Sequence, residues 1–200
     1  MVAWRVTREW PAATVFIVAG GPSVSALDLT PLRDRHVIAI NSSWEAIPSA
    51  AFLFFADYRW WLQNGERTQA FAGRIVTTTK SCEDKRVLHL AKIKPPPSLA
   101  TTPDALVLQR TSLQGAINLA YHLGAARLVL IGADMGRAAD GRTHHHRPHP
   151  WSCRSDCWDR QMEQLRKVAP ELERLGVEVL NASPASRIDW WPKVELVDCL

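Results

Sequence analysis

The sequence predicts an α/β fold: one domain built on a doubly wound, mostly parallel sheet of about seven strands, with helices on both faces. Two observations lead to this prediction. Short apolar runs alternate with helical segments along the chain, as in folds that wind strands and helices in turn. Within the runs, Val, Ile, Leu and Phe follow one another without strict alternation, which indicates strands buried on both faces. The 200 residues, 46% of them hydrophobic, suffice for one domain with a sizeable core.

The first expected strand ends at the most informative segment of the chain, Gly20-Gly21-Pro22-Ser23. Glycines at such a turn let backbone N–H groups approach a ligand. Ser23 is suited to cap a following helix, whose N-terminus favours an anion. Neither a GxGxxG nor a GxxxxGK[ST] pattern is present, so the turn predicts a phosphate site without naming the ligand. The full set of expected strands is 14–19, 36–41, 51–56, 73–78, 105–109, 127–132 and 177–181.

Two segments carry apolar residues at the helical period, 112–123 and 156–175. Thr111 or Ser112 is expected to cap the first helix, and Gly124 to end it. In the second helix Pro170 predicts a kink or a break, because proline lacks a backbone N–H and clashes with the preceding turn.

Two other segments look irregular. Lys94–Pro103 contains three consecutive prolines and is expected to form an extended surface connection. Residues 134–155 combine glycines and prolines with a histidine cluster, and a loop of this length is usually functional or disordered. We expect a His-rich active-site loop there, within a single nucleotide-binding domain that spans residues 1–200.

Composition limits the classes of partner. The formal charge of +4 is spread along the chain, which argues against a nucleic-acid-binding arm and leaves room for a basic cleft that binds a nucleotide. No apolar stretch is long enough to span a membrane, and no signal-peptide segment precedes the first strand, so we expect a cytoplasmic protein. The cysteines are then expected to be reduced, unless Cys153 and Cys157 hold a metal.

Polar and small residues follow almost every expected strand. In a doubly wound sheet, ligands bind beyond the carboxyl ends of the strands, so these residues are expected to share one edge. Each taken alone also suits a turn or a helix cap. The candidates for binding a nucleotide are Gly20, Gly21, Pro22, Ser23, Asn41, Ser42, Asp57, Arg59, Thr111, Ser112, Gly132 and Ser183, with Asp134 as a further polar group.

The histidine cluster is the second candidate for chemistry. In an extended segment His144 and His146 point to the same side, because side chains alternate. Three interpretations compete. A histidine among His144, His146 and His149 acts as a general base; the three bind zinc or another transition metal, with Cys153, Asp156 or Cys157 as further ligands; or the run is a solvated loop without a role.

The order of these motifs resembles the sialyltransferase fold of bacterial glycosyltransferase family 42 over residues 14–190. It is also similar to the related DUF115 proteins, with flagellin-modification and pterin-diphosphokinase-like members, and to uncharacterised phage proteins. The matching motifs are the Gly-Pro-Ser turn at 21–23, Asn41, Thr111-Ser112, Gly132-Ala133-Asp134 and Pro184-Ala185-Ser186. The resemblance implies a Rossmann-like fold, an asparagine that contacts the nucleotide, and a general base among His144, His146 and His149.

The leading hypothesis is a transferase that uses a nucleotide-activated sugar and requires no metal cofactor. The phosphates would lie on the Gly20–Ser23 turn and the Thr111–Ser112 helix start. Asn41 and Asp134 would hold the base or ribose, a loop histidine would deprotonate the acceptor, and Arg59 or Arg110 would stabilise the leaving phosphate. The acceptor is a glycan, a nucleotide or DNA, and a phage origin is implied by the resemblance alone.

Three alternatives remain open. A diphosphokinase-like enzyme would need Mg²⁺, with Asp57 and Asp134 as the natural ligands. A non-catalytic nucleotide-binding accessory protein would bind without turnover. A zinc-dependent hydrolase would use the histidine cluster. The sequence allows a homo-oligomer but does not determine the oligomeric state.

Overall fold

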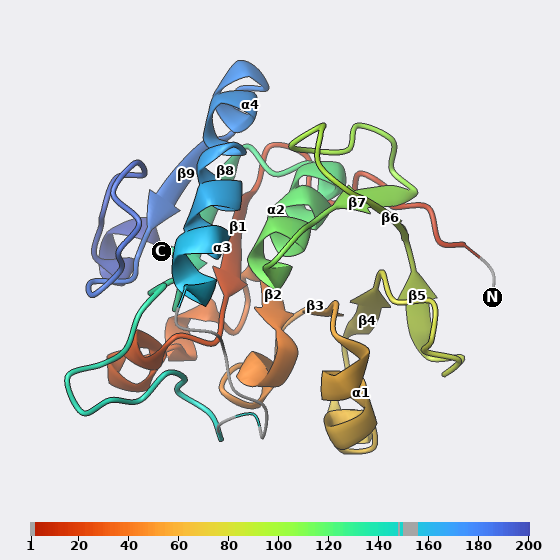
Figure 1. The fold of residues 1–200 in the computed structure, drawn as a ribbon, viewed down its shortest axis with the longest axis horizontal. Helices are drawn as coiled ribbons and strands as arrows, with labels where there is room; N and C mark the ends of the chain where they lie inside the picture. Colours follow the sequence, from red (N-terminus) through yellow and green to blue (C-terminus); the bar gives the residue numbers. More distant parts are fainter. Residues whose placement is uncertain (1–2, 148, 150–155) are drawn as a thin grey trace.

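The computed structural model describes residues 3–147, 149 and 156–200. Its centre is a seven-stranded sheet in the order β5-β4-β3-β2-β1-β8-β9, in which every neighbouring pair is parallel (Figure 1). The strands are β1 Thr14–Val18, β2 His36–Ile40, β3 Phe52–Phe55, β4 Arg74–Thr77, β5 Val87–His89, β8 Arg127–Ile131 and β9 Glu178–Asn181. The predicted α/β fold with a parallel sheet is confirmed.

The strand order places a topological switch point between β1 and β8. The chain winds outward from β1 through β2, β3 and β4 to β5, then returns to the other side of β1 as β8 and continues to β9. Connections from the two halves leave in opposite directions at this point, and doubly wound sheets bind ligands at such a point, beyond the carboxyl ends of the strands. The Gly20–Ser23 turn follows β1, and Gly132–Asp134 follows β8.

Both faces of the sheet are buried, so each strand alternates between two apolar clusters. Val15 and Ile17 of β1 pack in one cluster, together with α2 (Ser112–Leu123), α3 (Cys157–Arg166) and α4 (Ala169–Arg174). Phe16 and Val18 pack in the other, beneath α1 (Tyr58–Asn64) and several short 3-10 turns. These turns are η1 Pro22–Ala26, η2 Thr30–Leu32, η3 Asn41–Glu45, η4 Arg67–Ala70 and η5 Leu196–Cys199.

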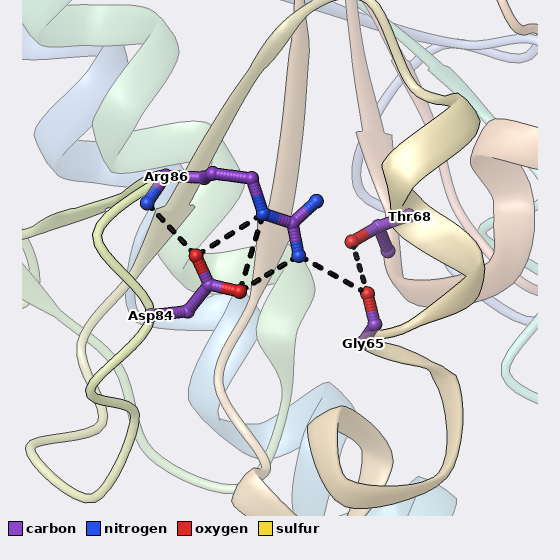
Figure 2. Close-up of polar contacts among 4 residues, drawn as sticks. All are labelled: Gly65, Thr68, Asp84 and Arg86. Carbon is purple, nitrogen blue, oxygen red and sulfur yellow. Dashed lines mark hydrogen bonds and ion pairs between the residues drawn. The ribbon is translucent and has the colours of Figure 1, made fainter.

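The tryptophan pair Trp60-Trp61 belongs to the second cluster. Trp60 is fully buried and Trp61 is 9% exposed, and the Trp61 ring stacks on Phe55 at 4.8 Å between ring centroids. This pair therefore packs the core. Next to it, Figure 2 shows how the connection into β5 is tied to α1: Arg86 pairs with Asp84 and donates to the carbonyl of Gly65, which also accepts from Thr68.

One predicted strand lies in a different place. Residues 105–109 were expected in the main sheet, but β7 (Ala105–Val107) pairs with β6 (Ala91–Ile93) in a separate two-stranded sheet. The seventh strand of the main sheet is β5, which the sequence analysis did not identify. Three residues that end in a histidine are too short to show the buried apolar pattern.

The connection between β6 and β7 is less exposed than predicted, because α2 holds it inward. The Asn118 side chain accepts hydrogen bonds from the backbone N–H groups of Ala100 and Val107, and it donates to the Ala100 carbonyl. Leu99 and Ala100 are each 2% exposed. The expected surface connection over 94–103 thus contributes to the core.

The helix predictions are largely confirmed. In α2 the Thr111 hydroxyl accepts from the N–H of Leu113, and Gly124 ends the helix in the left-handed region at φ +106°. The predicted helix over 156–175 is divided into α3 and α4, and Pro170 lies in the first turn of α4. The expected break occurs because proline has no N–H to continue the helical hydrogen-bond pattern.

Two local expectations are wrong. Ser23 was expected to cap an α-helix, but a 3-10 turn follows, without a side-chain cap. The cysteines were expected to be reduced, but Cys157, at the start of α3, is disulfide-bonded, while Cys82 and Cys199 are free thiols. Cys153 lies outside the described residues.

His122 makes the stability of the fold depend on pH. Its ring is 8% exposed, and burial lowers its pKa below the usual 6.5. The folded state therefore disfavours the protonated ring, and the unfolded state binds more protons as the pH falls below about 6.5. The free energy of unfolding therefore falls by up to about 1.4 kcal/mol for each pH unit below 6.5, until the pH reaches the folded-state pKa of His122. Urea unfolding between pH 7.5 and 5 should give a shallower dependence for His122→Gln than for the native chain, and equal slopes would contradict this.

Candidate functional site

The two turns at the switch point are joined directly. The N–H of Gly21 donates to the Gly132 carbonyl at 2.9 Å, and the N–H of Ser23 donates to Asp134 Oδ2 at 2.8 Å. Asp134 is 3% exposed. The Asp134 carboxylate thus accepts the hydrogen bond of one backbone amide in the Gly20–Ser23 turn, and this bond fixes the turn against the end of β8.

This close approach explains two of the glycines. A Cβ on Gly21 would lie 2.3 Å from Asp134 Oδ2 and 2.4 Å from the Gly132 carbonyl oxygen. Gly132 has φ +69°, and a Cβ there would lie 2.7 Å from the carbonyl oxygen of Ala19. Any side chain at either position would force the turns apart, so the sequence needs glycine at both.

The histidine loop lies across the ends of β1 and β2. The N–H of His145 donates to the Gly20 carbonyl at 3.1 Å, and His145 Nε2 is 3.1 Å from the hydroxyl of fully buried Ser43. Figure 1 shows this loop at the carboxyl edge of the sheet, beside the turns that follow these strands. His145 therefore anchors the loop, and the adjacent His144 and His146 lie beside Gly20.

His144, His146 and His149 converge beside Gly20. One ring nitrogen from each lies within 4.8 Å of those of the other two, and the ring centroids are 4.9–5.3 Å apart. A Cβ on Gly20 would meet His146 Nε2 at 3.0 Å and His144 Cδ2 at 3.2 Å. The predicted placement of His144 and His146 on one side of the loop agrees with this arrangement. We call these three residues the histidine cluster.

Two of the rings are oriented by hydrogen bonds on their outer nitrogens. His146 Nδ1 is 2.9 Å from the carbonyl of Arg147, which can only accept, so Nδ1 carries the proton. His144 Nδ1 is 2.8 Å from the Thr143 hydroxyl. In the neutral His146 ring the lone pair is therefore on Nε2, on the side of Gly20.

The cluster is held neutral near physiological pH. Burial lowers the pKa of His144 and of His145 to about 4, and repulsion from His146 adds to the effect. Burial also lowers the pKa of His146, although the Arg147 carbonyl and Glu45 oppose this effect. Burial lowers the pKa of His149 as well, and here Asp57 opposes the effect. The carboxylate of Asp57 thus lies near enough to act on the cluster.

Unpaired polar atoms gather at the same edge. Among the described residues, eight buried side-chain nitrogen or oxygen atoms have no hydrogen-bond partner, and three of these are Ser23 Oγ, Asn41 Oδ1 and Asp134 Oδ1. They follow β1, β2 and β8, the three strands around the switch point. Asn41 also has φ +51°, an uncommon value for a residue other than glycine. Buried polar atoms are nearly always paired, so three of the exceptions following neighbouring strands single out this edge as the candidate site.

A polar hollow of about 280 Å³ lies farther along this edge, between the end of β3 and the start of α2. Its charged and hydroxyl-bearing lining comes from Asp57, Tyr58, Lys92, Arg110, Thr111 and Ser112. Asp57 caps α1 by accepting from the N–H of Arg59, and it pairs with the Arg59 guanidinium at 2.6 Å. Lys92 and Arg110 give the hollow a positive side.

Some candidates from the sequence have structural roles instead of lining a site. The Ser42 hydroxyl accepts from the indole N–H of Trp60 at 2.9 Å, in the core. Ser183 is fully buried, and its hydroxyl accepts from the N–H of Ala133 at 2.9 Å. Pro22 is buried at the start of η1. These three residues shape the edge of the sheet, whereas Ser23, Asn41, Asp134 and the histidine cluster remain the candidates for contact with a ligand.

Sequence reasoning missed three contributors: Ser43, His145 and Lys92. The alternation that placed His144 and His146 on one side also implies that His145 faces the other way, toward the sheet. Lys92 gave no signal, because β6 and its placement beside the start of α2 depend on tertiary contacts.

The comparisons with known proteins bear on the fold. No protein-family model and no curated protein matches the chain. The MAf glycosyltransferase from Magnetospirillum magneticum AMB-1 aligns with 95% of this chain at a TM-score of 0.63 and 15% identity, and the chain spans about a third (34%) of that protein. The sialyltransferase CstII from Campylobacter jejuni, solved with CMP-3FNeuAc, aligns with 91% of this chain and 85% of its own at a TM-score of 0.50 and 13% identity. The structure of the sialyltransferase Cst-II in complex with CMP also aligns at a TM-score of 0.50. The alignment has 10% identity and covers 92% of this chain and 86% of the Cst-II chain.

At these identities the likeness establishes the architecture: the chain has a glycosyltransferase-like α/β fold. Separately, none of the described helices combines the length and the apolar character needed to cross a membrane.

Proposed function

We propose that this protein is a transferase that takes a sugar from a nucleotide-activated donor. The observation that carries the proposal is the set of unpaired buried atoms Ser23 Oγ, Asn41 Oδ1 and Asp134 Oδ1 around the switch point. They lie where a doubly wound sheet binds nucleotides, on a fold shared with glycosyltransferases. CstII was solved with a CMP-sugar analogue, which supports a nucleotide sugar as the donor class.

The donor occupies the crevice between the ends of β1, β2 and β8. Asn41 Oδ1 and Asp134 Oδ1 accept hydrogen bonds from the base or ribose, and the Ser23 hydroxyl contacts the phosphate. The amides of Gly21 and Ser23 already have partners in the fold, so the phosphate depends less on these amides than the Gly-Gly-Pro-Ser pattern suggests. Positive charge from Lys92 and Arg110 stabilises the departing phosphate.

The histidine cluster supplies the base. The acceptor hydroxyl oxygen forms a bond to the anomeric carbon, and the bond from that carbon to the phosphate oxygen breaks. The nucleotide leaves with the electron pair, and the hydroxyl proton passes to a neutral imidazole. We assign this role to His146, because its Nδ1–H is held by the Arg147 carbonyl and its Nε2 lone pair faces the Gly20 turn.

We further propose that the donor binds without a divalent cation. A magnesium site for the diphosphokinase alternative would need carboxylates free to coordinate. Asp57 is engaged by Arg59 and by the start of α1, and one oxygen of Asp134 is engaged by Ser23. Within the described residues the two carboxylates join no group of metal-ligating side chains.

A thermal-shift panel of CMP-, UDP- and GDP-linked sugars, with EDTA or with Mg²⁺, tests this proposal. A ligand at 100 times its Kd should raise the Tm by about 5–10 °C for a chain of this size. We expect one nucleotide class to do so in EDTA, and Asp134→Asn to abolish the shift. Asp189→Asn, a change in an exposed pair with Arg166, is the matched control and should keep it.

Stabilisation by ATP or GTP only with Mg²⁺ would instead support the diphosphokinase alternative. No shift with any ligand, from protein that unfolds cooperatively, would overturn the nucleotide site.

A further inference from the structure

We propose that His144, His146 and His149 form a binding site for one zinc ion. The proposal concerns metal binding and does not rest on the proposed transferase activity. Three imidazoles from a six-residue segment meet beside Gly20, with one nitrogen from each within 4.8 Å of the others. All three histidines are among the described residues, and the proposed site needs no protein ligand beyond these three.

The spacing is close to that of a metal site. With Zn–N bonds of about 2.0–2.1 Å, the ligand nitrogens of a tetrahedral centre lie about 3.4 Å apart. Ring nitrogens within 4.8 Å reach this distance by a contraction of at most about 1.4 Å, which side-chain rotation in a loop can supply. Three histidines leave a fourth position for water or an oxygen ligand, as in catalytic zinc sites.

The orientation of the rings supports the same assignment. A histidine that ligates a metal through one nitrogen usually donates its other N–H to a carbonyl, carboxylate or water, which fixes the tautomer. His146 already makes such a bond to the Arg147 carbonyl, and His144 Nδ1 contacts the Thr143 hydroxyl. In both rings Nδ1 is engaged, which leaves Nε2 as the nitrogen available to a metal. The His146 Nε2 and the His144 Cδ2 edge are the ring atoms that lie beside Gly20.

The surroundings limit which side chains act as ligands. Glu45 and Asp57 lie near enough to act on the charges of His146 and His149, but each is paired with an arginine, Arg67 and Arg59 respectively, so neither is assigned as a ligand. His145 is excluded, because its Nε2 is engaged by Ser43.

A metal at this site would use the same Nε2 lone pair that the proposed base needs. Zinc and the acceptor proton therefore compete for His146, and excess zinc should inhibit the transfer that EDTA-treated protein performs. This consequence separates the two proposals, since binding of zinc is measurable without any turnover.

The test is the zinc content and affinity of the full chain after EDTA treatment and re-addition of Zn²⁺. We expect one zinc per chain, a rise in Tm with Zn²⁺, and the visible spectrum of a tetrahedral site with nitrogen ligands when Co²⁺ replaces it. His144→Ala, His146→Ala and His149→Ala should each weaken zinc binding by at least about 100-fold, since loss of even an outer partner costs 10–100-fold. His36→Gln, at the opposite end of β2, is the matched control and should bind normally.

Each variant must keep the circular dichroism and Tm of the EDTA-treated native chain, which shows that it is folded. Absence of stoichiometric zinc from folded native protein would overturn the proposal. So would zinc binding that all three alanine variants retain, or a thiolate absorption band with Co²⁺, which would place the metal on cysteine. Nucleotide binding in EDTA would be unaffected by any of these results, so failure of the zinc site leaves the proposed function standing.

Discussion

The variant His146→Ala is expected to lose about 10²–10⁴-fold of the transfer rate while it retains donor binding. The side chain contributes a neutral Nε2 beside the Gly20 turn and takes no part in the buried contacts between β1 and β8. Its loss should therefore remove the proton acceptor without disturbing the turn. The measurement is kcat and KM for the donor in EDTA, with binding followed separately by thermal shift.

Two controls give this prediction its meaning. His36→Gln alters an exposed histidine far from the cluster and should leave kcat unchanged. Ser43→Ala removes the partner of His145, loosens the loop, and should lower the rate less than His146→Ala does. If His146→Ala turns over at the native rate, the base is another group and the proposed mechanism fails at that step.

The variant Gly21→Ala is expected to have the largest effect on the site as a whole. The added Cβ would lie 2.3 Å from Asp134 Oδ2 and 2.4 Å from the Gly132 carbonyl oxygen, so the turn after β1 must separate from the turn after β8. Overpacking of this kind costs about 1–3 kcal/mol, and here it also breaks the contact that places Asp134. We expect a lower free energy of unfolding in urea and loss of donor binding.

Gly136→Ala is the matched control. A Cβ at that position would meet the flexible Arg187 side chain at 3.3 Å and the Asp134 carbonyl oxygen at 3.8 Å, an ordinary van der Waals contact, and the backbone is outside the left-handed region. Its stability and its donor binding should stay near those of the native chain. A Gly21→Ala protein with native stability and native binding would show that the junction of the two turns does not organise the site.

The fold was predictable because burial on both faces leaves a strong pattern. Six of the expected strands lie in the main sheet, and the capped helix over 112–123 begins at Thr111 and ends at Gly124 as predicted. The misplaced segment is instructive. Residues 105–107 are as apolar as a central strand, and only Asn118, whose side chain binds the backbone at Ala100 and Val107, shows why they pair with β6 instead.

The sequence was enough to predict at which edge of the sheet the candidate site lies, but not which contacts its side chains make. The rule that polar residues at strand ends share one edge correctly placed Ser23, Asn41 and Asp134 after neighbouring strands at the carboxyl edge of the sheet. It did not reveal that Ser42 and Ser183 are used inside the core, or that Asp134 binds the backbone of the Gly-Gly-Pro-Ser turn. These depend on distances between segments far apart in the chain, such as the 111 residues that separate Ser23 from Asp134.

The measurement that tests the central claim most directly is the release of free nucleotide from CMP-, UDP- and GDP-linked sugars by the EDTA-treated chain, followed by chromatography. The account predicts release from one donor class, loss of release in His146→Ala with donor binding retained, and loss of both in Gly21→Ala. Folded native protein that neither binds nor consumes any of these donors would contradict it.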